Sequence, residues 1–269
     1  MSTATREARA GLAILRRDFD LVRRYLSWEL VFLFYNVVNV LSIALIAYLE
    51  PAQKRSEIIL YLSIGALLWG FLSVLFQEIA NAVSVERWEG TIETTFMAPM
   101  HRLTYLIGTS AYALVYGLVR TGIALLAIAL FFHLSFAHAR ALPAAAILAA
   151  SCLPFVGLGL VAAVLPVLST ERGAQATQVL QGILLLVSGV YYPISVLPGW
   201  IRWLGEISPA TYTLEAERAA LLSGSGWTLL GPDFLRLLLS GAVLIPLGLW
   251  VFSLGEQHAL RTGRLKRNG

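Results

Sequence analysis

The sequence predicts an all-α membrane protein with six transmembrane helices. Of its 269 residues, 58% are hydrophobic and 13% are charged, and the mean hydropathy is +0.73. Soluble domains carry about 25% charged residues, so this chain lacks the polar side chains to cover a water-facing surface. Six apolar runs each approach the roughly 20 residues that a membrane-crossing helix needs. We therefore expect residues 1–269 to form a single transmembrane domain.

The first expected element is an amphipathic helix over residues 6–26. Its apolar side chains recur at spacings of three and four, with arginines and aspartates between them. A helix of this kind lies in the membrane interface, with its arginines near anionic lipid headgroups. A solvated helix packed on a soluble partner would show the same periodicity and is the alternative.

The six spans are expected at 28–49, 58–77, 103–134, 141–168, 174–194 and 237–255. Several contain prolines, which membrane bundles tolerate because neighbouring helices satisfy the freed carbonyl groups. With the N-terminus in the cytosol, thirteen lysines and arginines lie on the cytosolic side and six on the other. The excess of positive charge on the cytosolic side predicts both termini inside, in a cytoplasmic (inner) membrane. The same clustering at chain ends and connectors argues against a nucleic-acid partner.

The connector between the second and third spans predicts a short helix over residues 84–99. On a helical wheel its glutamates share one face and its large apolar side chains share the other. The two sets are Glu86, Glu89 and Glu93 against Trp88, Ile92 and Phe96. Gly90 weakens a continuous helix by about 1 kcal/mol, and Pro99 ends it. An ordinary interfacial helix with a solvated acidic face is the alternative.

A few polar residues lie inside the expected spans. Arg120 is the only ionisable residue deep within one. It either contacts an anionic substrate or has a structural role, in which it makes a hydrogen bond between spans or extends outward to the membrane surface. Asn36, Asn39, Tyr112 and Tyr116 could line a substrate path with it, although such residues more often join helices together.

The segment 189–232 is too apolar for a solvated loop and too rich in proline and glycine to cross a membrane. Tryptophans favour the headgroup level, and irregular backbone at membrane depth needs cover from protein or a water-filled cavity. Short helices that dip in and out near the outer face satisfy both conditions. The alternative is an interfacial loop that only anchors the fifth and sixth spans.

Sequence motifs for chemistry are absent from this chain. It contains no G-x-x-x-x-G-K-[ST], no H-E-x-x-H and no G-x-S-x-G. We therefore expect no catalytic residue, metal or cofactor in the chain itself. A membrane-embedded lipid-modifying enzyme would need clustered acids or histidines, and a carrier driven by an ion gradient would need acids within its spans. Both are kept as alternatives.

Two stretches resemble the permeases of type-2 ATP-binding-cassette (ABC) exporters. The first is Glu86-Arg-Trp-Glu-Gly-Thr-Ile-Glu93, followed by Pro99 and Arg102, which is similar to the coupling-helix region of that family. The second begins at Gly189-Val-Tyr-Tyr-Pro193, continues through Leu197-Pro198 and Trp200, and ends at Ser208-Pro209-Ala-Thr-Tyr212 with Arg218. It resembles the family's external hairpin, except that Ala210 stands where many members have leucine.

The resemblance implies a function and a set of site residues. A separate ATPase subunit, which binds ATP and Mg²⁺, would act on Glu86, Arg87, Glu89, Gly90, Thr91, Glu93, Pro99 and Arg102. A re-entrant hairpin over 195–230 would form an external gate with Tyr191, Tyr192, Pro193, Pro198, Trp200, Pro209 and Tyr212. The permease would pair with a second copy or a paralogue in the lipid bilayer. Its cargo would be an amphipathic or hydrophobic drug, lipid, glycan or glycolipid.

Overall fold

The computed structural model describes residues 3–49, 51–98, 100–132, 139–169 and 172–262. Within these ranges the chain is helical, with two short 3₁₀ turns and no strand, so the all-α class is confirmed. In chain order the elements are α1 (Thr3–Arg24), α2 (Leu26–Leu45), η1 (Ile46–Leu49), α3 (Ala52–Glu89), α4 (Ile92–Met97), α5 (Arg102–Phe132), α6 (Ala141–Ala162), α7 (Val164–Leu168), α8 (Gly173–Val187), η2 (Ile194–Val196), α9 (Gly199–Ile207), α10 (Pro209–Leu221) and α11 (Trp227–Arg261).

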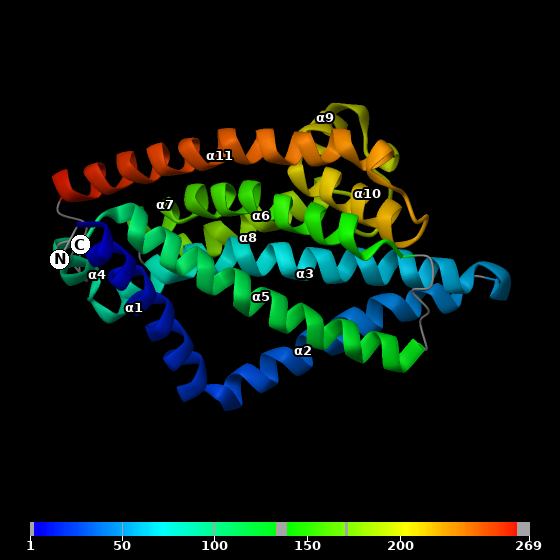
Figure 1. Cartoon of the computed structure of the whole chain (residues 1–269), viewed down its shortest axis with the longest axis horizontal. Coiled ribbons are helices and arrows are strands. Elements are labelled where there is room, and N and C mark those ends of the chain that lie inside the picture. The colour runs from blue at the N-terminus through cyan, green and yellow to red at the C-terminus, as the bar shows by residue number, and fades with distance from the viewer. Residues whose placement is uncertain (1–2, 50, 99, 133–138, 170–171, 263–269) are drawn as a thin grey trace.

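The long helices run along one axis, and the two ends of the bundle differ (Figure 1). One end holds α4, the first turns of α1 and the last turns of α11. The opposite end holds α9 and α10. We call the first the coupling end and the second the hairpin end. The two motifs of the sequence therefore lie at opposite ends of the molecule.

Within the described ranges, five helical segments are long and apolar enough to cross a membrane. They are Leu26–Leu49, Gln53–Glu89, Leu103–Phe132, Ala141–Leu168 and Trp227–Arg261. The remaining expected span, 174–194, which is the fifth in chain order, is shorter than predicted because α8 ends at Val187. Its 15 residues extend roughly 22 Å, which is less than the hydrocarbon core of about 30 Å. Gly189 adopts a φ of +67° just beyond it, and this left-handed conformation ends the helix.

The boundary between the second span and the connector differs from the prediction. Instead of a span ending at residue 77 and a separate helix over 84–99, α3 continues for 38 residues to Glu89. Gly90 then adopts a φ of +75°, and only the six residues of α4 follow. The helix continues because polar side chains of its last turns find partners within the chain: Gln77 donates to Gln181 and Glu86 pairs with Arg17.

Glycines let α6 and α11 approach closely. Gly241, Gly248 and Gly255 lie seven residues apart on α11 and face α6 and α7. A Cβ on Gly248 would lie 2.6 Å from the carbonyl oxygen of Gly157, which is too close for any side chain. Small residues at such crossings are typical of membrane helices, where close van der Waals packing replaces the hydrophobic effect.

The N-terminal helix α1 packs across α5 and meets α2 at a bend near Tyr25 (Figure 1). Gly108 of α5 is the crossing point, since a Cβ there would lie 3.1 Å from the carbonyl oxygen of Gly11. The predicted amphipathic helix is therefore present, and part of its apolar face is covered by the chain's own bundle.

Candidate functional site at the coupling end

Two of the residues expected to contact an ATPase are buried inside the chain. Glu86 is 3% exposed and Arg87 is 2% exposed. Glu86 accepts a hydrogen bond from Nη1 of Arg17 at 2.7 Å, and Nη1 of Arg87 donates to the carbonyl oxygen of Val167 at 3.2 Å. These contacts correct the expectation for both residues, because their side chains hold α3 to α1 and α7 and do not face outward.

The next three predicted residues form an exposed turn. Glu89, Gly90 and Thr91 lie on the surface where α3 ends. The turn is ordered by the backbone amide of Thr91, which donates to the carbonyl oxygen of Glu86 at 2.9 Å. We call Glu89–Thr91 the α3 turn. This turn of the predicted coupling segment is exposed and available to another protein.

The break at Gly90 also separates the apolar residues that the helical wheel placed together. Trp88 is 67% exposed, whereas Ile92 is 1% exposed in a core cluster with Ile79 and Val83. Pro99 lies outside the described residues, and the side chains of Glu93, Phe96 and Arg102 are not described.

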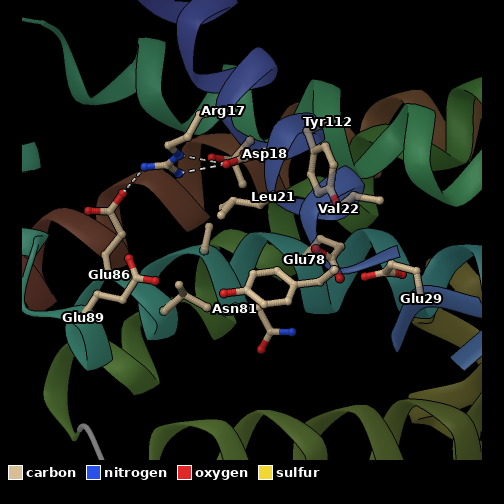
Figure 2. Close-up of a pocket in the computed structure, with 14 residues that line it drawn as sticks. Arg17, Asp18, Leu21, Val22, Glu29, Glu78, Asn81, Glu86, Glu89 and Tyr112 are labelled. Atoms are coloured by element: carbon tan, nitrogen blue, oxygen red, sulfur yellow. Dashed lines mark hydrogen bonds and ion pairs between the residues drawn. The ribbon is translucent and has the colours of Figure 1, made fainter. Parts of the chain in front are cut away.

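An ion-pair group joins α1 to the last turns of α3. Arg17 bonds to Glu86 and also to Asp18, at 2.9 Å (Figure 2). Partial burial works against the charge of Arg17, but its two carboxylate partners outweigh burial and raise the pKa of its guanidinium. Burial raises the pKa of Asp18 despite the neighbouring Arg17. The pair fixes the position of α1 relative to the α3 turn.

A second contact fixes the other end of α1. The Oε2 of Glu7 accepts a hydrogen bond from the hydroxyl of Thr104 at 2.5 Å and another from the backbone amide of His101 at 3.1 Å. These two hydrogen bonds lower the pKa of Glu7. A carboxylate at the start of a helix also interacts favourably with its macrodipole. Glu7 thus anchors α1 to the beginning of α5.

A cavity of about 330 Å³ lies between α1, α2, α3 and α5 (Figure 2). Its α3 wall is one stripe of the helix, because residues 78, 81, 82, 85 and 89 recur at helical spacing. The full lining is Arg17, Asp18, Leu21, Val22, Tyr25, Glu29, Glu78, Asn81, Ala82, Val85, Glu86, Glu89, Thr109 and Tyr112. Tyr112, which is predicted to lie on a substrate path, is part of this lining, and so are Glu86 and Glu89 of the predicted acidic face. The sequence does not predict that they meet Glu78 and α1 in one cavity.

The sequence matches one known family over most of the chain. A family model described as "ABC-2 type transporter" matches residues 10–222. The chain belongs to this family. No curated protein matches the chain. The ABC-2 domain identifies the chain as the membrane permease component of an ABC transporter, and such a permease is a transport subunit that normally works with an ATP-binding subunit.

Three of the predicted path residues of this permease lie in contact with one another along α5. The hydroxyl of Tyr116 donates to Glu29 at 2.5 Å, and Nη1 of Arg120 donates to that hydroxyl at 3.4 Å. Nη2 of Arg120 donates to the carbonyl oxygen of Phe32 at 3.3 Å. Tyr112 stacks on Tyr116, with ring centroids 5.6 Å apart. Arg120 therefore makes one hydrogen bond between spans, from α5 to the Phe32 carbonyl of α2, as the structural alternative predicted.

The two predicted asparagines do not join this group of residues. Asn36 faces α3, with its Nδ2 3.8 Å from the position that a Cβ on Gly70 would take. Asn39 is exposed on the outer face of α2. Neither residue lines the cavity, whose wall is built nearer the coupling end.

The hairpin end of the permease is fastened to α3 by Arg218. The guanidinium of this buried α10 residue lies 3.6 Å from the ring centroid of Tyr61 and donates to its hydroxyl at 3.0 Å. It also donates to the carbonyl oxygens of Gly189 and Val190, just after α8. Gly65 on α3 has no room for a Cβ against this group. Arg218 was noted in the second motif, but its contact with Tyr61, 157 residues away, has no sequence signal.

The predicted gate residues surround this contact without forming one cluster. Pro209 is buried at the start of α10, whereas Pro193, Pro198 and Trp200 are exposed, Trp200 at 77%. Tyr191 is half-buried against two core clusters. The hydroxyls of Tyr192 and Tyr212 donate to the carbonyl oxygens of Leu186 and Glu206. These hydrogen bonds fix the shape of the hairpin end.

Proposed function

We propose that this permease is the membrane-spanning subunit of an ATP-driven exporter in the cytoplasmic membrane, with both termini in the cytosol. A separate subunit binds ATP and Mg²⁺ and hydrolyses the nucleotide. The cargo is an amphipathic or hydrophobic molecule, such as a drug, a lipid, a glycan or a glycolipid. The observation that carries the proposal is the exposed α3 turn with the carboxylate of Glu89 at the coupling end of an ABC-2 permease.

The uninterrupted length of α3 supports a mechanical role for this turn. The helix is roughly 57 Å long for 38 residues. Its last turns carry the α3 turn, and its first half carries Tyr61, which contacts Arg218 at the hairpin end. Force applied at Glu89 by a closing ATPase would reach the hairpin through one rigid helix. Transmission by rigid elements between two discrete arrangements is a common design in such switches.

A second permease subunit, either another copy or a paralogue, completes the proposed transporter. One permease offers only one wall of a pathway between subunits, and a closed two-fold pair is the commonest symmetry of protein oligomers. The short helix α8 exposes Val179, Ile183 and Leu186. These side chains face lipid or a second subunit.

Two charge reversals on the same helix test the ATPase contact. Glu89→Arg changes the α3 turn, and Glu57→Arg is the matched control because Glu57 is an exposed glutamate in the first turns of α3. We expect Glu89→Arg to abolish co-purification of the ATPase and ATP-dependent export, while Glu57→Arg leaves both unchanged. Retention of the ATPase and of export by Glu89→Arg would refute the proposal. Cargo movement by this chain alone in proteoliposomes would favour a carrier driven by an ion gradient.

A further inference from the structure

We propose that the cavity beneath α1 binds an organic cation with an apolar body, and that cations of this class are cargo of the permease. The transport step rests on the proposed function, whereas binding requires only this chain. The volume of about 330 Å³ falls in the range of about 300–1,000 Å³ that small-molecule sites occupy. Amphipathic helix α1 forms one wall and membrane-crossing helices α2, α3 and α5 form the others, so the site adjoins the membrane interface.

The lining carries five carboxylates and one guanidinium. The carboxylates are Asp18, Glu29, Glu78, Glu86 and Glu89, and the guanidinium is that of Arg17. Arg17 pairs with Asp18 and Glu86, and Glu29 accepts the hydroxyl of Tyr116. Five carboxylates against one guanidinium leave the lining strongly negative, because the hydrogen bond from the neutral hydroxyl of Tyr116 does not cancel the charge of Glu29. An anion is therefore repelled from the cavity, and a cation is attracted.

Glu78 distinguishes this site from a solvated acidic face. Burial separates its carboxylate from water, and Glu29 repels its charge. Arg120 attracts it from a distance, but the hydrogen bonds of that guanidinium go to Tyr116 and to the Phe32 carbonyl. No described residue forms a hydrogen bond or an ion pair with Glu78. A carboxylate without a partner at this depth costs free energy until a cation meets it.

The remaining walls indicate an organic cation with an apolar body. Tyr25 and Tyr112 line the cavity, and Figure 2 shows Tyr112 there. Tyr112 is held by ring contacts to Phe19 and Tyr116. Aromatic faces attract cations, most strongly when water is excluded. Leu21, Val22 and Val85 offer apolar contact. Among the described residues no three potential metal ligands converge, so a coordinated metal ion does not fit this wall.

Two probes of the same shape and opposite charge test the inference. The purified full chain, in lipid nanodiscs without ATPase or ATP, is dialysed against tetraphenylphosphonium or tetraphenylborate, and empty nanodiscs provide the background. We expect saturable binding of tetraphenylphosphonium only. Glu78→Gln should weaken it by about tenfold, because one unit charge beside the ligand is removed in a partly dehydrated site. Glu57→Gln is the matched control on α3 and should bind like the parent.

A third variant tests the aromatic wall. Tyr25→Leu keeps apolar bulk but removes the ring, and we expect about three- to thirtyfold weaker binding of tetraphenylphosphonium. Thermal melting of each variant confirms that it is folded. Competition by a choline-headgroup lipid, but not by phosphatidylglycerol, would indicate a lipid headgroup as the natural cation. No competition by either would indicate a water-borne compound.

Three results would overturn the inference. Equal affinity for both probes would show an apolar pocket without charge selection. Unchanged affinity in Glu78→Gln would remove the carboxylate from the site. Loss of the ATPase in Glu78→Gln, with no probe binding to the parent, would show that a basic side chain of the ATPase fills the cavity. If tetraphenylphosphonium binds but is not exported with ATP, the proposed function fails and the binding site stands.

Discussion

The ion pair between Arg17 and Glu86 gives a quantitative test of how α1 is held to α3. Glu86 is 3% exposed, so Arg17→Gln would leave a buried carboxylate without its cation and close to Asp18. Removing one partner of a fully buried pair costs about 3–5 kcal/mol. The side chain of Arg17 is 43% exposed, so water compensates part of the loss. We therefore expect a cost of about 1.5–3 kcal/mol in the free energy of unfolding.

A double-mutant cycle isolates this pair from other effects. The parent, Arg17→Gln, Glu86→Gln and the double variant are melted in one detergent, with tryptophan fluorescence as the readout. About 2–4 °C of melting temperature corresponds to 1 kcal/mol in a chain of roughly this size, so each single variant should melt about 3–12 °C lower. The double variant should cost less than the sum of the two by about 1–2 kcal/mol, because neither charge is then left alone.

Additive costs would refute the ion-pair reasoning. A second outcome would restore the expectation from the sequence alone. If Glu86→Gln melts like the parent but no longer retains the ATPase, then Glu86 faces the partner and does not support α1. Retention of the ATPase by Glu86→Gln, together with a lower melting temperature, is the result that the structure predicts.

Three further predictions concern other parts of the chain. Gly248→Ala should lower stability by about 1–3 kcal/mol in a thermal melt, because its Cβ would overlap the Gly157 carbonyl, whereas Gly231→Ala, which has open space on the same helix, should be neutral or slightly stabilising. Arg218→Lys should lower the melting temperature and export together, because one ammonium cannot both stack on Tyr61 and reach the carbonyl oxygens of Gly189 and Val190. A variant that melts and exports like the parent would contradict the role of Arg218 in holding the hairpin end to α3. The pKa of Glu7 is lowered in the folded chain, so the contribution of its carboxylate to stability is complete above the ordinary pKa of 4.5. That contribution is lost as the pH falls through the lower pKa of the folded chain. Hydrogen exchange in α1 should therefore rise in that acidic window, and Glu7→Gln should abolish the pH dependence.

The sequence was sufficient for the helical class and the order of the elements. Apolar runs of about 20 residues leave few alternatives in lipid, because the backbone must satisfy its own hydrogen bonds there. Gly90 and Gly189 also acted as the helix-ending residues that glycine chemistry allows, since both adopt positive φ. The errors lie at boundaries: α3 runs on to Glu89, and α8 ends at Val187.

The site was less accessible because it depends on contacts between distant segments. A helical wheel places Glu86 beside Glu89, but it does not show that Arg17, 69 residues earlier, pairs with Glu86 and buries it. The sequence places Glu78 in the connector after the second span, so nothing in it indicates that the stripe of α3 that begins at Glu78 forms a cavity wall. For Arg120 the sequence alone allows either a substrate contact or a structural role, and the hydrogen bond from Arg120 to the Phe32 carbonyl of α2 favours the structural role.

A cross-linking measurement tests most directly whether the α3 turn contacts the ATPase subunit. Cys152 is the only cysteine, and Cys152→Ser gives a background in which Glu89→Cys or Glu57→Cys can carry a photoreactive benzophenone. Irradiation of membranes that contain the assembled transporter should join the chain to the ATPase from position 89 only, with a yield that changes when ATP is added. Cross-links from position 57 but not from position 89 would contradict the account.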